Sequence, residues 1–267
     1  MTVLSKIERA RQDGAESLDL SGMGLTALPD AIGQLTALQV LNIARNKLTA
    51  LPAAIGKLTA LQELYVWGNQ LTELPDAIGK LTALQQLDVS DNYLTALSDS
   101  IGKLTALQDL NVWRNQLTAL PSAIGQLSAL RRLDVWGNKL TALPAAIGQL
   151  TALRELDVWG NQLTALPESI GRLSDLQELY VSENQLTALP AAIGQLKSLE
   201  RLRLDGNRLK SLPQEIFQLT ELKELWLHGN QFEAFPHKIV DLPSIRGIYI
   251  DKNACFASLA KGASDDA

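Results

Sequence analysis

The sequence lacks several features that extracellular, nucleic-acid-binding and membrane-spanning proteins need. It has one cysteine in 267 residues, so no intramolecular disulfide can form and a reducing compartment is favoured. Its net charge of -5 argues against nucleic-acid binding, which usually requires a basic surface. No apolar run is long enough for a signal peptide or a membrane span. These absences predict a cytoplasmic protein that binds neither nucleic acid nor membrane.

Groups suited to catalysis are also scarce, because the chain contains only two histidines. One of them, His228, shares a 23-residue spacing with Asp205 and Asp251. A carboxylate–His–carboxylate row could bind a metal or orient a base. The sequence indicates no further strong ligand and no nucleophile, so we favour an exposed imidazole between two acids. We therefore expect no enzymatic activity, no catalytic residue, no metal and no cofactor.

What the sequence has in abundance is one repeated phrase. Asparagine recurs every 23 residues, and Met23 takes the position one period before the first of them. Each of about eleven repeats reads approximately L-x-x-L-x-V-x-x-N-x-L-T-x-L-P-x-x-I-G-x-L-T-x. A fixed period of this length is typical of a solenoid. The asparagines are at positions 46, 69, 92, 115, 138, 161, 184, 207, 230 and 253.

The first half of each repeat has the pattern of a strand with one buried face. Leu64 and Val66 alternate with Tyr65 and Trp67, and such strands must stack in parallel to bury their apolar side. The second half returns the chain to the shared core. We predict that Gly56 and its equivalents adopt a positive φ in a tight turn. We also predict that the asparagines form an internal ladder, with their amides bonded to the backbone of adjacent turns.

Both ends of the chain are expected to differ from the repeats. Ser5 is predicted to cap a helix, with Glu8 as its capping-box partner. The predicted organisation is a capping helix over residues 1–14, a solenoid over residues 15–259 and a polar tail over residues 260–267.

Four of the five tryptophans occupy one position of the repeat, directly after the inward-facing valine. Alternation therefore places them on the outer face of the strands. Trp113, Trp136 and Trp159 come from consecutive repeats, so we expect a contiguous stripe. Stacked rings could instead serve only to stabilise the sheet. Because other repeats have alanine or serine at this position, we favour an interaction site.

Acidic side chains are predicted beside the tryptophans. Asp134 and Asp157 are expected to be lateral neighbours, which disfavours folding but suits a protein partner that offers Lys or Arg. Arg203 is predicted to stack between Tyr180 and Trp226 in a second patch. The predicted partner-binding residues are Tyr65, Trp67, Asp88, Trp113, Asp134, Trp136, Asp157, Trp159, Tyr180, Arg203 and Trp226.

The 23-residue pattern with "LPxxIGxL" resembles the leucine-rich repeats, over residues 15 to about 259. It looks like the intracellular Ras-group and its bacterial relatives, which include the repeats of Roco-type GTPases and of secreted effectors. The resemblance implies an α/β solenoid, a horseshoe with a parallel β-sheet on the concave face and short helical or 3-10 turns on the convex face. It also implies a non-catalytic scaffold for protein recognition, because the family's GTPase and ubiquitin-ligase modules are absent from the repeats.

Several alternatives remain open. Exposed tryptophans beside carboxylates would also suit a carbohydrate. The chain could also be a repeat region detached from a larger signalling or effector protein. The near identity of the repeats fits recent duplication in a bacterium or a consensus-designed protein, and the sequence does not indicate an oligomeric state.

Overall fold

The computed structural model describes residues 2–234 and 237–251. They form two compact units, Met1–Lys139 and Leu140–Ala267, called here the N-terminal unit and the C-terminal unit. The predicted polar tail and the last residues of the predicted solenoid lie outside the described residues. No helix in the described ranges has the length and apolar character needed to cross a membrane.

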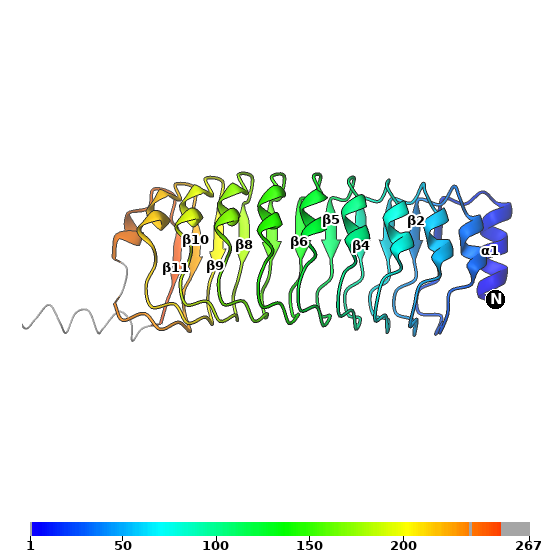
Figure 1. Ribbon diagram of the computed structural model, residues 1–267, viewed down its shortest axis with the longest axis horizontal. Helices are drawn as coiled ribbons and strands as arrows, with labels where there is room; N and C mark the ends of the chain where they lie inside the picture. The colour runs from blue at the N-terminus through cyan, green and yellow to red at the C-terminus, as the bar shows by residue number, and fades with distance from the viewer. Residues whose placement is uncertain (1, 235–236, 252–267) are drawn as a thin grey trace, which may run out of the picture. The chain divides into compact units, whose positions relative to one another are not determined.

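The N-terminal unit begins with a helix, α1 (Val3–Gln12), followed by short strands that alternate with 3-10 helices. Neighbouring strands pair in parallel and in chain order, with the middle leucine of each strand opposite the next (Figure 1). The strands are β1 (Ser17–Asp19), β2 (Val40–Asn42), β3 (Glu63–Tyr65), β4 (Gln86–Asp88), β5 (Asp109–Asn111) and β6 (Arg132–Asp134). The 3-10 helices are η1 (Asp30–Gln34), η2 (Ala53–Lys57), η3 (Asp76–Lys80), η4 (Asp99–Lys103) and η5 (Ser122–Gln126).

The C-terminal unit repeats the same alternation, and its strands also pair in parallel in chain order. The strands are β7 (Glu155–Asp157), β8 (Glu178–Tyr180), β9 (Arg201–Arg203), β10 (Glu224–Trp226) and β11 (Gly247–Tyr249). The 3-10 helices are η6 (Ala145–Gln149), η7 (Glu168–Arg172), η8 (Ala191–Gln195), η9 (Gln214–Gln218) and η10 (His237–Asp241).

The core of each unit is built from the apolar positions of the repeat. Leu64 and Val66 are fully buried, whereas the intervening Tyr65 is only half-buried. The isoleucines of the 3-10 helices, such as Ile55, close the core from the opposite side. The predicted solenoid, with a parallel sheet on one face and 3-10 turns on the other, is therefore confirmed within each unit.

The glycine of the 3-10 helix has a different role from the predicted one. Gly56 does not have a positive φ; instead, a Cβ at this position would lie 2.7 Å from the carbonyl oxygen of Ala77 in the next repeat. Glycine is needed there because adjacent turns approach each other closely. The prediction of a left-handed turn was wrong for this position.

In the described part of the chain, the left-handed conformation occurs instead at the residue before each ladder asparagine, from Asn46 to Asn230. Five repeats have glycine there, but four have a residue with a side chain at a φ of about 50°, a conformation that costs L-residues energy. The four residues are Arg45, Asp91, Arg114 and Glu183. The five glycines are Gly68, Gly137, Gly160, Gly206 and Gly229.

The asparagine ladder is confirmed from Asn46 to Asn230, whereas Asn253 lies outside the described residues. In a representative repeat, the Oδ1 of Asn69 accepts a hydrogen bond from the Leu48 N–H at 3.0 Å. Its amide nitrogen donates to the carbonyls of Ile43 at 3.0 Å and Val66 at 2.8 Å. The buried amide thus forms hydrogen bonds with backbone groups of its own repeat and of the preceding one. Regular strand pairing could not supply partners to these groups.

The N-terminal helix begins earlier than predicted. Its N-cap is Thr2, whose hydroxyl accepts from the Ser5 N–H at 3.2 Å, so Ser5 is not the cap. Glu8 does not reach back as a capping-box partner, because its carboxylate accepts from the Arg11 guanidinium at 2.7 and 2.9 Å. The pair lowers the pKa of Glu8 to about 2. The buried Ile7 faces the first repeat, and α1 packs against η1.

Ser98 stands where most repeats have proline, and its hydroxyl caps η4. It accepts from the Ser100 N–H at 3.1 Å and donates to Asp76 at 2.8 Å. We expect Ser98→Ala to lower the free energy of unfolding by about 0.5–2 kcal/mol through loss of this cap. Ser98→Pro loses the same bonds, but the φ of -74° at Ser98 suits proline. Proline restricts the unfolded chain, which should raise the free energy of unfolding by about 0.4–1 kcal/mol.

Urea unfolding of the two variants checks this expectation. The proline variant should be the more stable of the two. If it were less stable than the alanine variant, the backbone at Ser98 could not accept proline as the other repeats do.

Candidate functional site

The strand face of the N-terminal unit holds three tryptophans, each covered in part by an arginine. Arg45 lies 4.6 Å from the ring of Trp67. Trp113 and Trp136 meet edge to face, with ring centroids 5.3 Å apart. Arg114 lies 5.5 Å from the first of these rings and 4.7 Å from the second. The rings face outward as predicted, but the chain itself supplies cations to them.

The sequence reasoning missed these two arginines. Both occupy the left-handed position before an asparagine, and each precedes by 22 residues a tryptophan that it covers, Trp67 and Trp136. The phrases "IARN" and "VWRN" contain this signal. The left-handed backbone aims these side chains toward the neighbouring repeat, which alternation along a strand does not reveal.

The acids of the same face have a structural role that was also missed. Asp88 accepts a hydrogen bond from the Ser90 N–H at 3.0 Å, and Asp134 accepts one from the Trp136 N–H at 3.1 Å. Each carboxylate thus fixes the turn that follows its strand. Burial raises the pKa of Asp134, and the charge of Asp88 acts in the same direction, against the hydrogen bond from the Trp136 N–H.

Two predictions about neighbours remain predictions. Asp134 and Asp157 belong to different compact units, and so do Trp136 and Trp159. The predicted acidic pair and the full three-ring stripe are therefore not tested. The contact between Trp113 and Trp136 within the N-terminal unit is the part of the stripe that the structure places.

Tyr65 is held by two polar neighbours. Its hydroxyl contacts Oε2 of Glu63 at 2.8 Å and Oε1 of Gln86 at 2.9 Å. Burial, with the hydrogen bond to Glu63, raises the pKa of Tyr65 to about 12. The phenol is therefore neutral at physiological pH and holds its ring in place.

In the C-terminal unit the predicted stacked cation is confirmed. Arg203 lies 5.4 Å from the ring of Tyr180 and 4.4 Å from that of Trp226. Trp226 also stacks on Tyr249, with centroids 4.9 Å apart and an interplanar angle of 11°. These residues share one column of the sheet, because Trp226 pairs with Arg203 on one side and Tyr249 on the other.

A row of alternating charges flanks this column. Arg201 forms ion pairs with Glu178 and, at 3.3 Å, with Glu224. The hydroxyl of Tyr180 donates to Glu178, and burial together with this bond raises the pKa of Tyr180. Arg201 is thus paired on both sides, so a partner would gain little binding energy from this row.

Beside Arg203, the C-terminal unit contains a hollow of about 380 Å³. Its residues combine aromatic rings, carboxylates, one guanidinium and one hydroxyl. Trp159 is 38% exposed, the most exposed of the five tryptophans. The hollow is lined by Asp157, Trp159, Tyr180, Ser182, Glu183, Arg203 and Asp205.

The hollow joins four predicted residues to three that sequence reasoning did not select. Asp157, Trp159, Tyr180 and Arg203 were predicted to bind a partner. Ser182 and Glu183 were not, and Asp205 was considered only in the row with His228 and Asp251. Glu183 is in the left-handed position, with a φ of 51°. A Cβ on Gly206 would lie 2.5 Å from its Oε1, so the glycine of the next repeat leaves room for this carboxylate.

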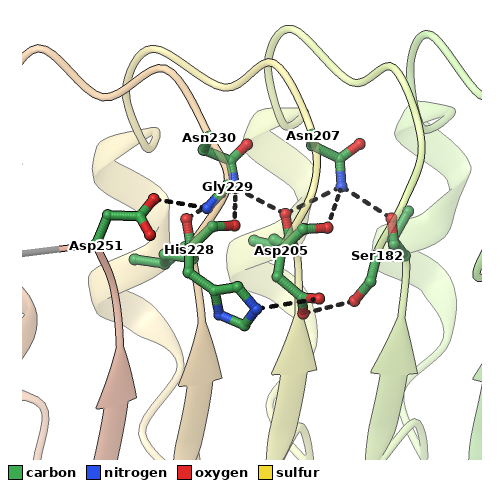
Figure 2. A network of polar contacts seen from close by, with 10 residues as sticks. Ser182, Asp205, Asn207, His228, Gly229, Asn230 and Asp251 are labelled. Atoms are coloured by element: carbon green, nitrogen blue, oxygen red, sulfur yellow. Dashed lines mark hydrogen bonds and ion pairs between the residues drawn. The ribbon is translucent and has the colours of Figure 1, made fainter.

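Figure 2 shows a polar network that includes Ser182 and Asp205, two of the residues that line the hollow. Ser182 donates to Oδ1 of Asp205 at 2.7 Å, and Nε2 of His228 lies 3.6 Å from Oδ2 of the same carboxylate. Asp251 instead accepts from the Gly229 N–H at 2.7 Å. The predicted row of three thus divides into a pair and a separate backbone contact. Within residues 2–234 and 237–251, no group of three or more His, Cys, Asp or Glu residues is arranged to hold a metal.

Comparison with known proteins addresses the family. No curated protein matches the chain significantly. Among solved structures, the chain is similar to the leucine-rich repeat protein LIC12759 of Leptospira interrogans, with 35% identity, a TM-score of 0.55, and coverage of 91% of this chain and 80% of that one. It is also similar to a TDR receptor, with 28% identity, a TM-score of 0.81, and coverage of 91% and 44%.

A third solved structure shares the fold. It is the functional domain of InlJ from Listeria monocytogenes, with 23% identity, a TM-score of 0.67, and coverage of 91% of this chain and 54% of that one. The chain thus spans about half the length of that InlJ domain and less than half that of the TDR receptor chain. The family model described as "Leucine-rich repeat region" matches residues 17–93, 87–162, 129–208 and 153–261. With the repeat and its asparagine ladder, these matches establish that the chain belongs to the leucine-rich repeat family.

Proposed function

We propose that this protein is a non-catalytic scaffold that binds a protein partner through the strand face, with the hollow of the C-terminal unit as its main contact. The observation that supports this most strongly is the hollow itself, about 380 Å³ in volume and lined by aromatic and acidic side chains. Its size is at the lower end of the range for ligand sites, which suits a side chain of a partner. Its carboxylates favour a basic one.

Trp159 is the residue we expect to contribute most to binding. Tryptophan is enriched among residues that dominate interface energetics, since it offers a large rigid area at little entropic cost. Its exposed ring lies beside Asp157, whose Oδ1 accepts from the Trp159 N–H at 2.9 Å. That bond fixes the backbone of Trp159, so the side chain projects from a defined position.

Trp159→Ala should reduce partner capture at least about tenfold and leave the fold intact, because the ring is partly exposed. The measurement is a quantitative pull-down from an extract of cells that express the protein, with calorimetry on the same preparations. Tyr93→Ala is a matched control, since Tyr93 is an aromatic residue that is 52% exposed and does not line the hollow. Undiminished capture by a folded Trp159→Ala variant would contradict the proposal.

Carbohydrate binding is the second candidate, because an exposed tryptophan beside carboxylates also suits a sugar ring. A glycan array distinguishes the two candidates. Retention of one glycan class by the native protein, lost in Trp159→Ala and kept in Tyr93→Ala, would favour the carbohydrate.

A further inference from the structure

We infer that the hollow of the C-terminal unit selects arginine over lysine from its partner. This inference rests on the proposed function and specifies its chemistry. It begins from the cations that the chain places on its own rings. In the described part of the chain, each cation found over an aromatic ring is an arginine, at 4.4 to 5.5 Å from the centroid.

Arg203 shows this arrangement at the wall of the hollow. Its guanidinium lies between Tyr180 and Trp226, and the planar group can stack on both rings. An ammonium would act on a ring only as a compact charge that holds its water strongly. A partner's guanidinium stacked on Trp159 would repeat the contact that Arg203 makes with Tyr180 and Trp226.

The charge of the hollow is complementary to such a group. Asp157, Glu183 and Asp205 contribute three carboxylates, whereas Arg203 contributes one cation. An incoming guanidinium would therefore enter an acidic environment. Aromatic rings can attract a cation but not a carboxylate, so both kinds of wall favour the same guest.

The carboxylates also approach the hollow from different repeats. Asp157 is the last residue of β7, Glu183 lies in the turn after β8, and Asp205 lies in the turn after β9. A guanidinium has five N–H donors in a fixed plane, so it can reach acceptors on several sides while its face stacks on a ring. An ammonium has three donors and no face to stack.

The test uses three blocked tripeptides, acetyl-Gly-X-Gly-amide, in which X is arginine, lysine or citrulline. Citrulline keeps the shape of arginine and removes its charge. The readout is the indole N–H signal of Trp159 in nitrogen-15 NMR spectra of the full chain, assigned with Trp159→Phe. We expect saturable shifts with the arginine peptide, at least about threefold weaker affinity for lysine, and no saturation with citrulline.

Two isosteric variants test the carboxylates. Glu183→Gln removes a charge from the hollow and should weaken the arginine peptide at least about threefold. Glu221→Gln removes an exposed charge outside the lining and should not change it. Equal affinity for arginine and lysine, or no shift of the Trp159 signal with the arginine peptide, would overturn the inference.

The inference and the proposed function can fail separately. If Trp159→Ala loses its protein partner while arginine and lysine peptides bind equally, the scaffold function stands and the selectivity for arginine is wrong. If the arginine peptide binds selectively but Trp159→Ala captures every partner, the hollow has the inferred chemistry and the partner binds elsewhere.

Discussion

Replacing Leu133 with alanine is expected to lower the free energy of unfolding by about 2–5 kcal/mol. Leu133 is the middle residue of β6 and is 0% exposed. Alanine removes buried apolar area and leaves a cavity, because the neighbouring leucine of β5, Leu110, is held in register by the strand pairing. In a solenoid each repeat is stabilised mainly by its neighbours, so contacts in a larger common core do not compensate for the lost stability.

Urea unfolding followed by circular dichroism measures the effect. Arg131→Ala is the matched control, because this exposed side chain directly precedes the same strand and its removal should change stability by less than about 0.5 kcal/mol. An unchanged transition for Leu133→Ala would mean that the inward and outward faces of β6 had been exchanged.

Replacing Asn115 with alanine should be about as damaging, at about 2–4 kcal/mol, although it removes little apolar area. Its Oδ1 accepts from the Leu94 N–H at 2.9 Å, and its amide nitrogen donates to the carbonyls of Val89 at 3.1 Å and Val112 at 3.0 Å. Without the amide, a buried N–H has no partner, and each such group costs about 1–3 kcal/mol. Thermal and urea unfolding should agree on the loss.

The chain contains a close control for this substitution. Asn111 lies four residues earlier, and its Oδ1 is buried without a hydrogen-bond partner. Asn111→Ala should therefore change the free energy of unfolding by less than about 1 kcal/mol. Similar losses in the two variants would show that asparagine stabilises this region by packing rather than by hydrogen bonds.

The parts of the structure that follow from a strict period were predictable from sequence. Leu64 and Val66 could be assigned to the buried face because alternation along a strand allows only two assignments of the faces, and the eleven repeats indicate the same one. The asparagine ladder followed because a buried amide in a solenoid has only the backbone of adjacent turns to bond. The column of Tyr180, Arg203 and Trp226 followed because the repeat length fixes the register between strands.

Features that depend on exceptions to the repeat were not predictable in the same way. The glycine of the 3-10 helix and the glycine before asparagine are both simply glycine in sequence. Only the distance between Gly56 and Ala77, and the positive φ of Gly68, show that one permits close approach and the other a left-handed turn. The cover that Arg114 gives to Trp136 was missed for the same reason.

The left-handed position before each asparagine has a consequence for how this surface could change over time. Its backbone is left-handed whether the residue is Gly137 or Glu183, and a Cβ on Gly137 would meet no atom closer than 3.5 Å, so a side chain can be gained or lost there at a cost of about 1–2 kcal/mol without rearranging the repeat. Such a change places a charge beside the strand face, as Arg45 and Glu183 show. The charge of the strand face can therefore change one repeat at a time, through single substitutions at a position that the core does not use.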